Sequence, residues 1–221
     1  MKTLREFAGW LEEEEASGSE FSLEALKSIP HLPSQNLELA SIKAYLTKCF
    51  GDPIGDGTFR DVWIIDDNHI IKVAKKSTRV DQNSNEKYNA ECMGPSYSIK
   101  VLDQHPRFFW LIEERVQPLT EEEFVRAFGL KLGIQLEPRT KLKSGIDTST
   151  SLMISDIIEE LAGNKRSSRY ERILPEFQKS PWLNGLIKSL QDCDVGASDL
   201  HWGNWGIRPS TGELVLLDLG F

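Results

Sequence analysis

The sequence has few of the residues that mark secreted, metal-binding or membrane proteins. It holds three cysteines, Cys49, Cys92 and Cys193, which form no CxxC pair. Their odd number and scattered spacing argue for a reducing compartment and against a disulfide framework. The four histidines are not clustered, so no zinc site is expected. No apolar run reaches about 18 residues, so neither a membrane span nor a membrane partner is expected.

Basic residues are also in the minority. The chain carries 34 acidic and 26 basic side chains, which gives a net charge of −8. A protein that binds the phosphate backbone of nucleic acids usually shows a basic excess, so no nucleic-acid partner is expected. Four consecutive glutamates, Glu12 to Glu15, follow a short apolar patch near the N-terminus, and this pattern is not a signal peptide. These features predict a cytoplasmic protein.

Residues 1–47 are predicted to form a helical N-terminal extension, because their apolar residues recur at helical spacing. Ser22 is placed to begin one short helix that stops at Pro30, and another helix is expected around residues 37–46. The extension either packs as a cap on the rest of the chain or docks a partner protein, with the acidic run as its solvated face.

Residues 48–117 are predicted to form a small antiparallel sheet. Strands are expected near residues 50–54, 59–65, 69–74, 97–102 and 108–116. A helix-compatible stretch at 80–93 separates the third strand from the fourth. Five strands with one helix between them indicate an α+β layout.

Residues 118–221 are predicted to be mainly helical. Thr120 is placed as the N-cap of a helix that runs to Phe128, and further helices are expected at 155–162 and 181–192. The stretch 129–151 is rich in Gly, Pro, Lys and Ser and is expected to be the least structured part of the chain.

The densest group of functional side chains lies between Asp199 and Asp218. The segment from Asp199 to Asn204 reads Asp-Leu-His-Trp-Gly-Asn, and Asp218 ends an apolar strand. A turn at 210–212 would fold these segments into a hairpin and bring Asn204 beside Asp218. Amide and carboxylate oxygens suit Mg²⁺, which shares its shell with substrate phosphates. Asp199 would then stand across from this pair as a base.

These motifs resemble the protein-kinase-like superfamily over residues 50–221. Asp199 and Asn204 resemble its catalytic loop, and Asp218-Leu219-Gly220 resembles the metal-binding DFG element with Leu in place of Phe. The spelling is closer to ABC1-type kinases and to aminoglycoside and choline phosphotransferases than to ordinary eukaryotic-type kinases. The resemblance implies a two-lobed fold, with a five-stranded N-lobe at 48–117 and a reduced helical C-lobe at 118–221.

The resemblance also implies a nucleotide site in the N-lobe. Gly55 and Gly57 resemble the first two glycines of the loop that covers the ATP phosphates, whereas Arg60 stands where the third glycine is expected. Val62 would lie under adenine. The backbone of residues 113–116, from Glu113 to Val116, would form the hinge that contacts adenine.

Lys72 resembles the lysine that pairs with the α and β phosphates of ATP. Such a lysine is held by a carboxylate from the following helix. Both Glu86 and Glu91 qualify, and Glu86 is preferred because it leaves a longer remainder of helix after it.

The implied activity is that of an ATP- and Mg²⁺-dependent kinase that transfers phosphate to an alcohol group. A protein serine or threonine is the favoured acceptor, because so small a C-lobe offers no evident deep acceptor pocket. A small hydroxyl-bearing molecule, such as an aminoglycoside or a choline-like alcohol, is the alternative. The third hypothesis is a nucleotide-binding pseudokinase that acts as a regulatory module and uses its N-terminal helices as the contact surface.

The printed sequence ends at Phe221, one residue after the Asp-Leu-Gly glycine, so no activation segment and no regulation through its phosphorylation are expected. Minimal kinase-like proteins of this kind occur among bacterial effectors and phage proteins. The resemblance therefore implies the cytosol of a bacterium or of its host.

Overall fold

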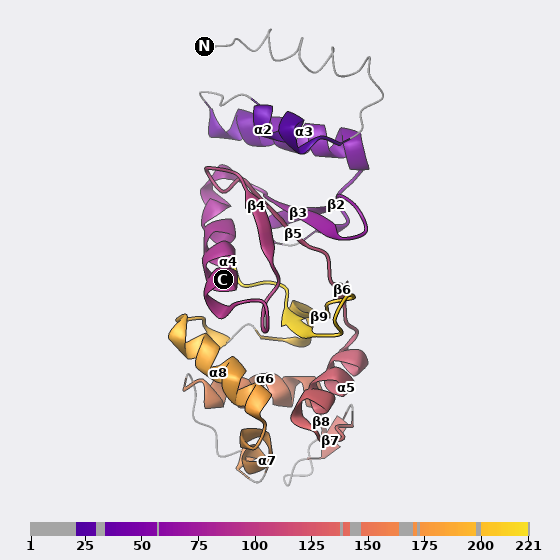
Figure 1. Cartoon of the computed structure of the whole chain (residues 1–221), viewed down its shortest axis with the longest axis vertical. Coiled ribbons are helices and arrows are strands. Elements are labelled where there is room, and N and C mark those ends of the chain that lie inside the picture. Colours follow the sequence, from indigo (N-terminus) through magenta and orange to yellow (C-terminus); the bar gives the residue numbers. More distant parts are fainter. Residues whose placement is uncertain are drawn as a thin grey trace. The chain divides into compact units, whose positions relative to one another are not determined.

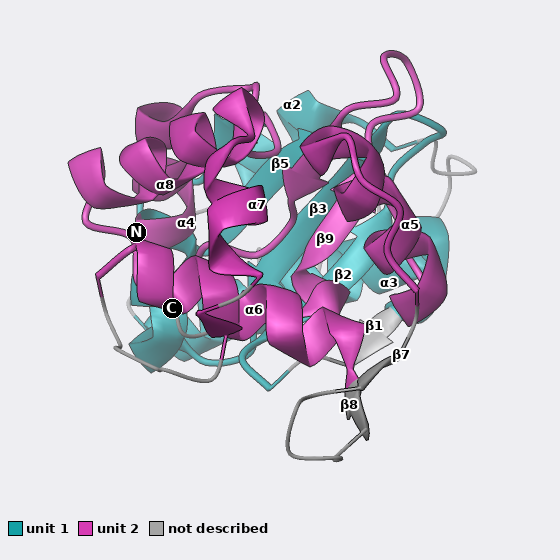
Figure 2. Cartoon of the chain, turned by 90° about the horizontal axis from the view of Figure 1, so that it is seen from below, with its two compact units in different colours: residues 1–84, 101–115 teal, residues 85–100, 116–221 magenta. Residues whose placement is uncertain are grey.

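The chain folds into two compact units (Figure 2), and its helices and strands are labelled in Figure 1. Unit 1 comprises residues 1–84 and 101–115, and unit 2 comprises residues 85–100 and 116–221. Helix α4 (Val80–Met93) therefore contributes residues to both units. The computed structural model describes residues 21–29, 34–56, 58–137, 139–141, 147–163, 170–171, 173–197 and 200–220.

Unit 1 is built on an antiparallel sheet with the strand order β1-β2-β3-β5-β4. Four of its strands have four to six residues, and β1 at the edge has two. The strands are β1 (Gly55–Asp56), β2 (Arg60–Ile64), β3 (His69–Ala74), β4 (Val101–Gln104) and β5 (Trp110–Glu114). Together with the helices of both units, this sheet confirms the predicted α+β class.

The predicted strand at 50–54 is wrong, because the first strand, β1, comprises only Gly55–Asp56. Helix α3 (Gln35–Phe50) runs through Phe50, and Gly51 ends it with a φ of +78° and an N–H bond to the Thr47 carbonyl at 2.8 Å. Glycine adopts positive φ without steric cost, so it is a natural helix terminator. The fourth strand also begins later than the predicted 97, because residues 97–99 pair elsewhere, within unit 2.

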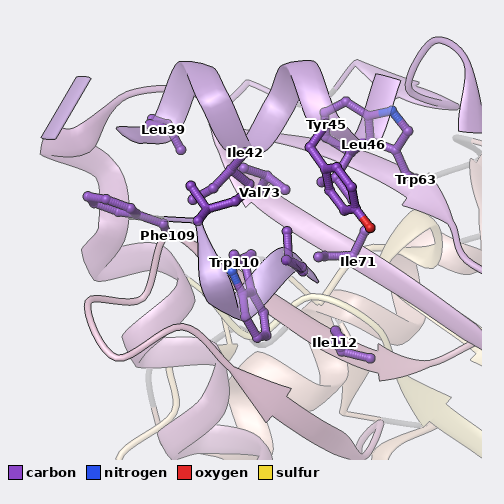
Figure 3. Close-up of a cluster of buried hydrophobic side chains, with 12 residues drawn as sticks. Leu39, Ile42, Tyr45, Leu46, Trp63, Ile71, Val73, Phe109, Trp110 and Ile112 are labelled. Carbon is purple, nitrogen blue, oxygen red and sulfur yellow. The ribbon is translucent and has the colours of Figure 1, made fainter. Parts of the chain in front are cut away.

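Helix α3 covers one face of the unit 1 sheet (Figure 3). Leu39, Ile42 and Leu46 of α3 pack with Ile71 and Val73 of β3 in one buried cluster. Alternation along the strand sends Ile71 and Val73 to this face and the residue between them to the other. The short helix α2 (Leu23–Ser28) adds Leu26 to the same cluster, and the predicted Ser22 cap is confirmed by its side chain, which accepts from the Ala25 N–H.

A buried charged cluster fastens α3 to the turn between β4 and β5. Glu38 of α3 is fully buried and forms an ion pair with Arg107. The Nε2 atom of His105 lies 3.3 Å from the Glu38 carboxylate, and its ring stacks on Phe109 at 4.9 Å. A buried carboxylate is costly unless it is paired, and Arg107 supplies the opposite charge for Glu38.

Unit 2 combines helices with a three-stranded antiparallel sheet of order β10-β9-β6. The predicted Thr120 cap is confirmed: its side chain and that of Glu123 form a reciprocal capping box. The stretch predicted to be least structured contains the end of α5 and the paired strands β7 and β8. The elements are β6 (Gln117–Pro118), α5 (Glu121–Leu132), β7 (Arg139–Lys141), β8 (Asp147–Ser149), α6 (Thr150–Leu161), α7 (Leu174–Gln178), α8 (Pro181–Asp192), β9 (Trp205–Ile207) and β10 (Leu214–Leu216).

The expectation against disulfides is wrong for one pair of cysteines. Cys92 near the end of α4 and Cys193 at the end of α8 form a disulfide with Cα atoms 5.8 Å apart, whereas Cys49 is a free thiol. The Ser189 hydroxyl donates to the Met93 carbonyl at 3.3 Å and joins the same two helix ends. The two cysteines are 101 positions apart in sequence, so their spacing carried no sign that these helix ends meet.

Within the described part of the chain, no helix combines the length and the apolar character that a membrane crossing needs.

Replacing Glu38 with glutamine should destabilise the protein by about 3 kcal/mol, because the change leaves the Arg107 guanidinium without its buried counter-charge. Arg107 keeps 34% of its side chain exposed, which places the loss at the low end for a broken buried pair. Urea unfolding measures the loss. Glu24→Gln on the exposed face of α2 is the control, and equal losses in the two variants would contradict this account.

Replacing Cys92 with serine should lower the free energy of unfolding by about 2–4 kcal/mol, because a long-range cross-link restricts the unfolded chain. Dithiothreitol should lower the unfolding midpoint of the wild type and of Cys49→Ser but leave that of Cys92→Ser unchanged. A thiol count provides the direct check. Three reactive thiols in the denatured, unreduced wild-type protein would show that the disulfide is absent.

Candidate functional site

The sequence-predicted site residues divide between the two units. Gly57 and Asp199 lie outside the described residues. Unit 1 holds Gly55, Val62, Lys72 and Glu113, and unit 2 holds Glu86, Val116, Asn204 and Asp218.

In unit 1, Lys72 lies on the sheet face opposite α3. Strand register pairs Lys72 with Val62 on β2 and with Leu111 on β5. Residues that face each other across an antiparallel pair share a face, so these three side chains form a row. Lys72 is only 7% exposed. The sheet thus presents a buried cation between apolar neighbours.

Lys72 forms an ion pair with Glu113 of the neighbouring strand β5. Its Nζ atom lies 2.9 Å from the Glu113 Oε2 atom, and the two side chains are 9% and 0% exposed. The family resemblance implied only backbone contacts for Glu113, so this role of its side chain is new. The signal was available, since an acid that follows the buried run Trp110 to Ile112 needs a cation as partner.

The predicted glycine loop joins β1 to β2. Gly55 faces Val62 in the ladder, and the Ile54 N–H donates to the Val62 carbonyl at 2.8 Å. Arg60, which stands in place of a third glycine, is 6% exposed and pairs in register with Ala74 on the Lys72 side of the sheet. The loop therefore leads directly into a strand that carries a second buried cation.

In unit 2, burial separates the two candidate carboxylates of α4. Glu86 is fully buried. The Glu91 side chain is 60% exposed and pairs with Lys87 at 2.6 Å across one helical turn. Glu91 is therefore engaged in a surface ion pair, and Glu86 remains the better candidate for a functional carboxylate.

The predicted hairpin between Asn204 and Asp218 is confirmed. Strands β9 and β10 pair antiparallel, with Trp205 facing Leu216. The next rung is the Leu217 N–H, which donates to the Asn204 carbonyl at 2.9 Å. Asn204 directly precedes β9 and Asp218 follows that rung, so both lie at the same end of the hairpin. The Asp218 Oδ1 atom accepts from the Gly220 N–H at 3.1 Å.

Buried contacts fix the loop that leads into this hairpin. The Leu200 carbonyl accepts from the Ser155 hydroxyl at 2.9 Å and from the Trp205 indole N–H at 3.3 Å. The Trp205 ring is fully buried and packs against Phe124 at 5.7 Å. His201 accepts from the Gly203 N–H through Nδ1 at 3.1 Å and so caps the short 3₁₀ turn that precedes β9.

The segment after α4 supports the other edge of the hairpin. The Leu216 N–H donates to the Tyr97 carbonyl at 2.9 Å, and the Ile99 N–H donates to the Leu216 carbonyl at 3.1 Å. The Asn89 side chain on α4 donates to the Leu219 carbonyl at 2.8 Å, directly beside Asp218. Val116, predicted to lie in the hinge, packs its side chain against Ile99 in a small core of unit 2.

Arg208 anchors the turn between β9 and β10. Its guanidinium is buried, donates to the Pro95 carbonyl at 3.0 Å and to the Ser98 carbonyl at 3.1 Å, and pairs with Glu213. A hydrogen bond from the Thr211 hydroxyl, and then the contact with Arg208, hold the pKa of Glu213 below its usual value. These bonds fix the hairpin to the residues that follow α4.

The donor set at the hairpin end fits a shared Mg²⁺ site. Asn204 and Asp218 are half-buried and offer one amide and one carboxylate oxygen donor group. Mg²⁺ is typically held by one or two carboxylates together with waters and substrate phosphates. Among the described residues, no group of three or more His, Cys, Asp or Glu could hold a metal by itself.

No known family model matches the chain, and no curated protein sequence matches it. Among solved structures, the SAICAR synthase of Saccharomyces cerevisiae, in complex with SAICAR, is similar over 76% of this chain and 72% of that chain. The identity is 10% and the TM-score is 0.35, a similarity that assigns neither fold nor activity.

Replacing Glu213 with glutamine should reduce stability at about pH 7, where the carboxylate is ionised, and less so in acid. The folded-state pKa of Glu213 is lowered, so its contribution is complete above the usual value of 4.5 and is lost as the pH falls through the folded pKa. Unfolding curves of both proteins across this range measure the difference. A stability gap that stays constant or widens below pH 4.5 would contradict this role.

Proposed function

We propose that the protein is an ATP- and Mg²⁺-dependent phosphotransferase with a protein-kinase-like fold. The observation that carries this proposal is the β9–β10 hairpin, which sets Asn204 and Asp218 at one end in unit 2. A buried lysine on the sheet of unit 1 supports it independently. Phosphoryl transfer depends mainly on positioning and on charge neutralisation, and these are the tasks that such residues perform.

Each residue has a defined role in this proposal. In unit 1, Lys72 binds the α and β phosphates of ATP. In unit 2, Glu86 is the proposed helix carboxylate, and Asn204 and Asp218 would hold Mg²⁺. The bound Mg²⁺ supplies neutralisation of phosphate charge. Asp199 accepts the proton of the attacking hydroxyl group, and the Gly55 loop with Val62 encloses the nucleotide.

The proposed acceptor is a serine or threonine hydroxyl of a protein. The Asp-Leu-His-Trp-Gly-Asn spelling of residues 199–204 favours a second candidate, a small alcohol of the aminoglycoside or choline type. Both acceptors present a hydroxyl group, so the chemistry at Asp199 is the same for either. A labelling experiment in a lysate distinguishes the two acceptors, because label appears in the protein fraction for one and in the small-molecule fraction for the other.

The proposal predicts Asp199-dependent transfer of the γ-phosphate. Purified wild type, Asp199→Ala and Asp218→Asn are incubated with Mg²⁺ and γ-labelled ATP in a cell lysate, and label is counted in protein and small-molecule fractions. Loss of a general base should reduce transfer by about 100-fold or more. Asp192→Ala, an exposed aspartate at the end of α8, is the matched control and should transfer normally.

Label on protein supports the protein kinase, and label on a small molecule supports the second acceptor. Equal label with wild type and Asp199→Ala would overturn the assigned base. No transfer in either fraction, with ATP still raising the melting temperature of the wild type, would replace the enzyme with a nucleotide-binding regulatory module.

A further inference from the structure

We infer that Glu113 is a positioning residue that holds Lys72 in the orientation needed to bind phosphate. This inference rests on the proposed function. It assigns a holding role to a carboxylate on the same sheet as the lysine, in addition to any carboxylate on the helix that follows β3. The contact that carries it is contained within unit 1.

The strand register explains how the two side chains meet. Glu113 faces Ile70, and Lys72 is two positions further along β3. Diagonal neighbours of this kind share a face, and long side chains can bridge the distance between them. The observed separation of 2.9 Å between Nζ and Oε2 is that of a direct ion pair.

Burial makes this pair more than a surface contact. Exposed ion pairs contribute little because water screens them, whereas Glu113 is fully buried and the Lys72 side chain is 9% exposed. A buried ammonium loses its hydration and requires a counter-charge to remain ionised. Glu113 provides that charge on a face where the flanking partners of Lys72, Val62 and Leu111, are apolar.

The backbone that carries Glu113 is fixed on both sides. Strand β5 lies between β3 and β4 in the sheet order, so its backbone is hydrogen-bonded to two neighbours. Lysine has a long flexible stem, and a partner on a fixed strand restricts its rotamers. An ammonium group carries several N–H donors, so contact with Glu113 is compatible with further contacts to phosphate oxygens.

The test separates binding of the phosphates from binding of the nucleoside. Isothermal titration in Mg²⁺ measures the affinities of ATP and of adenosine for the full-length wild type, Glu113→Gln, Lys72→Met and the double variant. Asp103→Asn is the matched control, because it removes the carboxylate of another ion pair on the same sheet, with Lys27. Melting temperatures of all variants are recorded in parallel.

Glu113→Gln should weaken ATP binding by about tenfold, the usual consequence of losing a charge-assisted contact, and change adenosine binding by less than about twofold. The double variant should bind ATP no more weakly than Lys72→Met alone, because Glu113 acts through Lys72. Asp103→Asn should bind both ligands as the wild type does.

Equal loss of ATP and adenosine affinity in Glu113→Gln, or losses that add in the double variant, would overturn the inference while leaving the phosphotransferase intact. A wild type that binds no ATP would overturn the proposed function and the inference with it. If Glu113→Gln does not fold, Glu113→Asp replaces it. Glu113→Asp keeps the charge but shortens the reach, so it should weaken ATP binding selectively, and unchanged affinity would contradict the role.

Discussion

The hydrogen bond from the Leu217 N–H to the Asn204 carbonyl fixes the register on which the candidate site of unit 2 depends. It extends the β9–β10 ladder by one rung and leaves Asn204 and Asp218 at its end. A slip of one residue would turn every strand side chain to the opposite face, so the placement of the two proposed metal ligands at the hairpin end depends on this register. The surrounding bonds, from Arg208 at one end and Asn89 near the other, oppose such a slip.

In unit 1, the alternation of side chains along the strands gives the two faces of the sheet different characters. One face of its sheet is apolar and carries α3, and this burial supplies the core that holds the strands in place. The opposite face carries Lys72 and Glu113, whose charges would be costly in the α3 core. Because side chains alternate between the two faces of a strand, the buried ion pair and the hydrophobic core lie on opposite faces of the same sheet.

Local patterns in the sequence predicted the local structure well. The α+β class, the Thr120 cap and the hairpin that joins Asn204 to Asp218 all follow from spacing and turn chemistry. The failures involve partners that are distant in sequence. Neither the Cys92–Cys193 disulfide nor the pairing of residues 97–99 with β10 leaves a local signal, because each depends on how separate elements meet. The ion pair of Glu113 with Lys72 is an intermediate case. The buried run before Glu113 indicates that this acid needs a cation, but the sequence does not indicate which one.

The claim that Asn204 and Asp218 form a metal site is tested most directly with Mn²⁺ as a spectroscopic substitute for Mg²⁺. Electron paramagnetic resonance counts the Mn²⁺ ions bound to wild type and to Asp218→Ala in the presence of a non-hydrolysable ATP analogue. The account predicts nucleotide-dependent binding of Mn²⁺ to the wild type and its loss in the variant. Equal binding by both proteins, or no bound Mn²⁺ in the wild type, would contradict it.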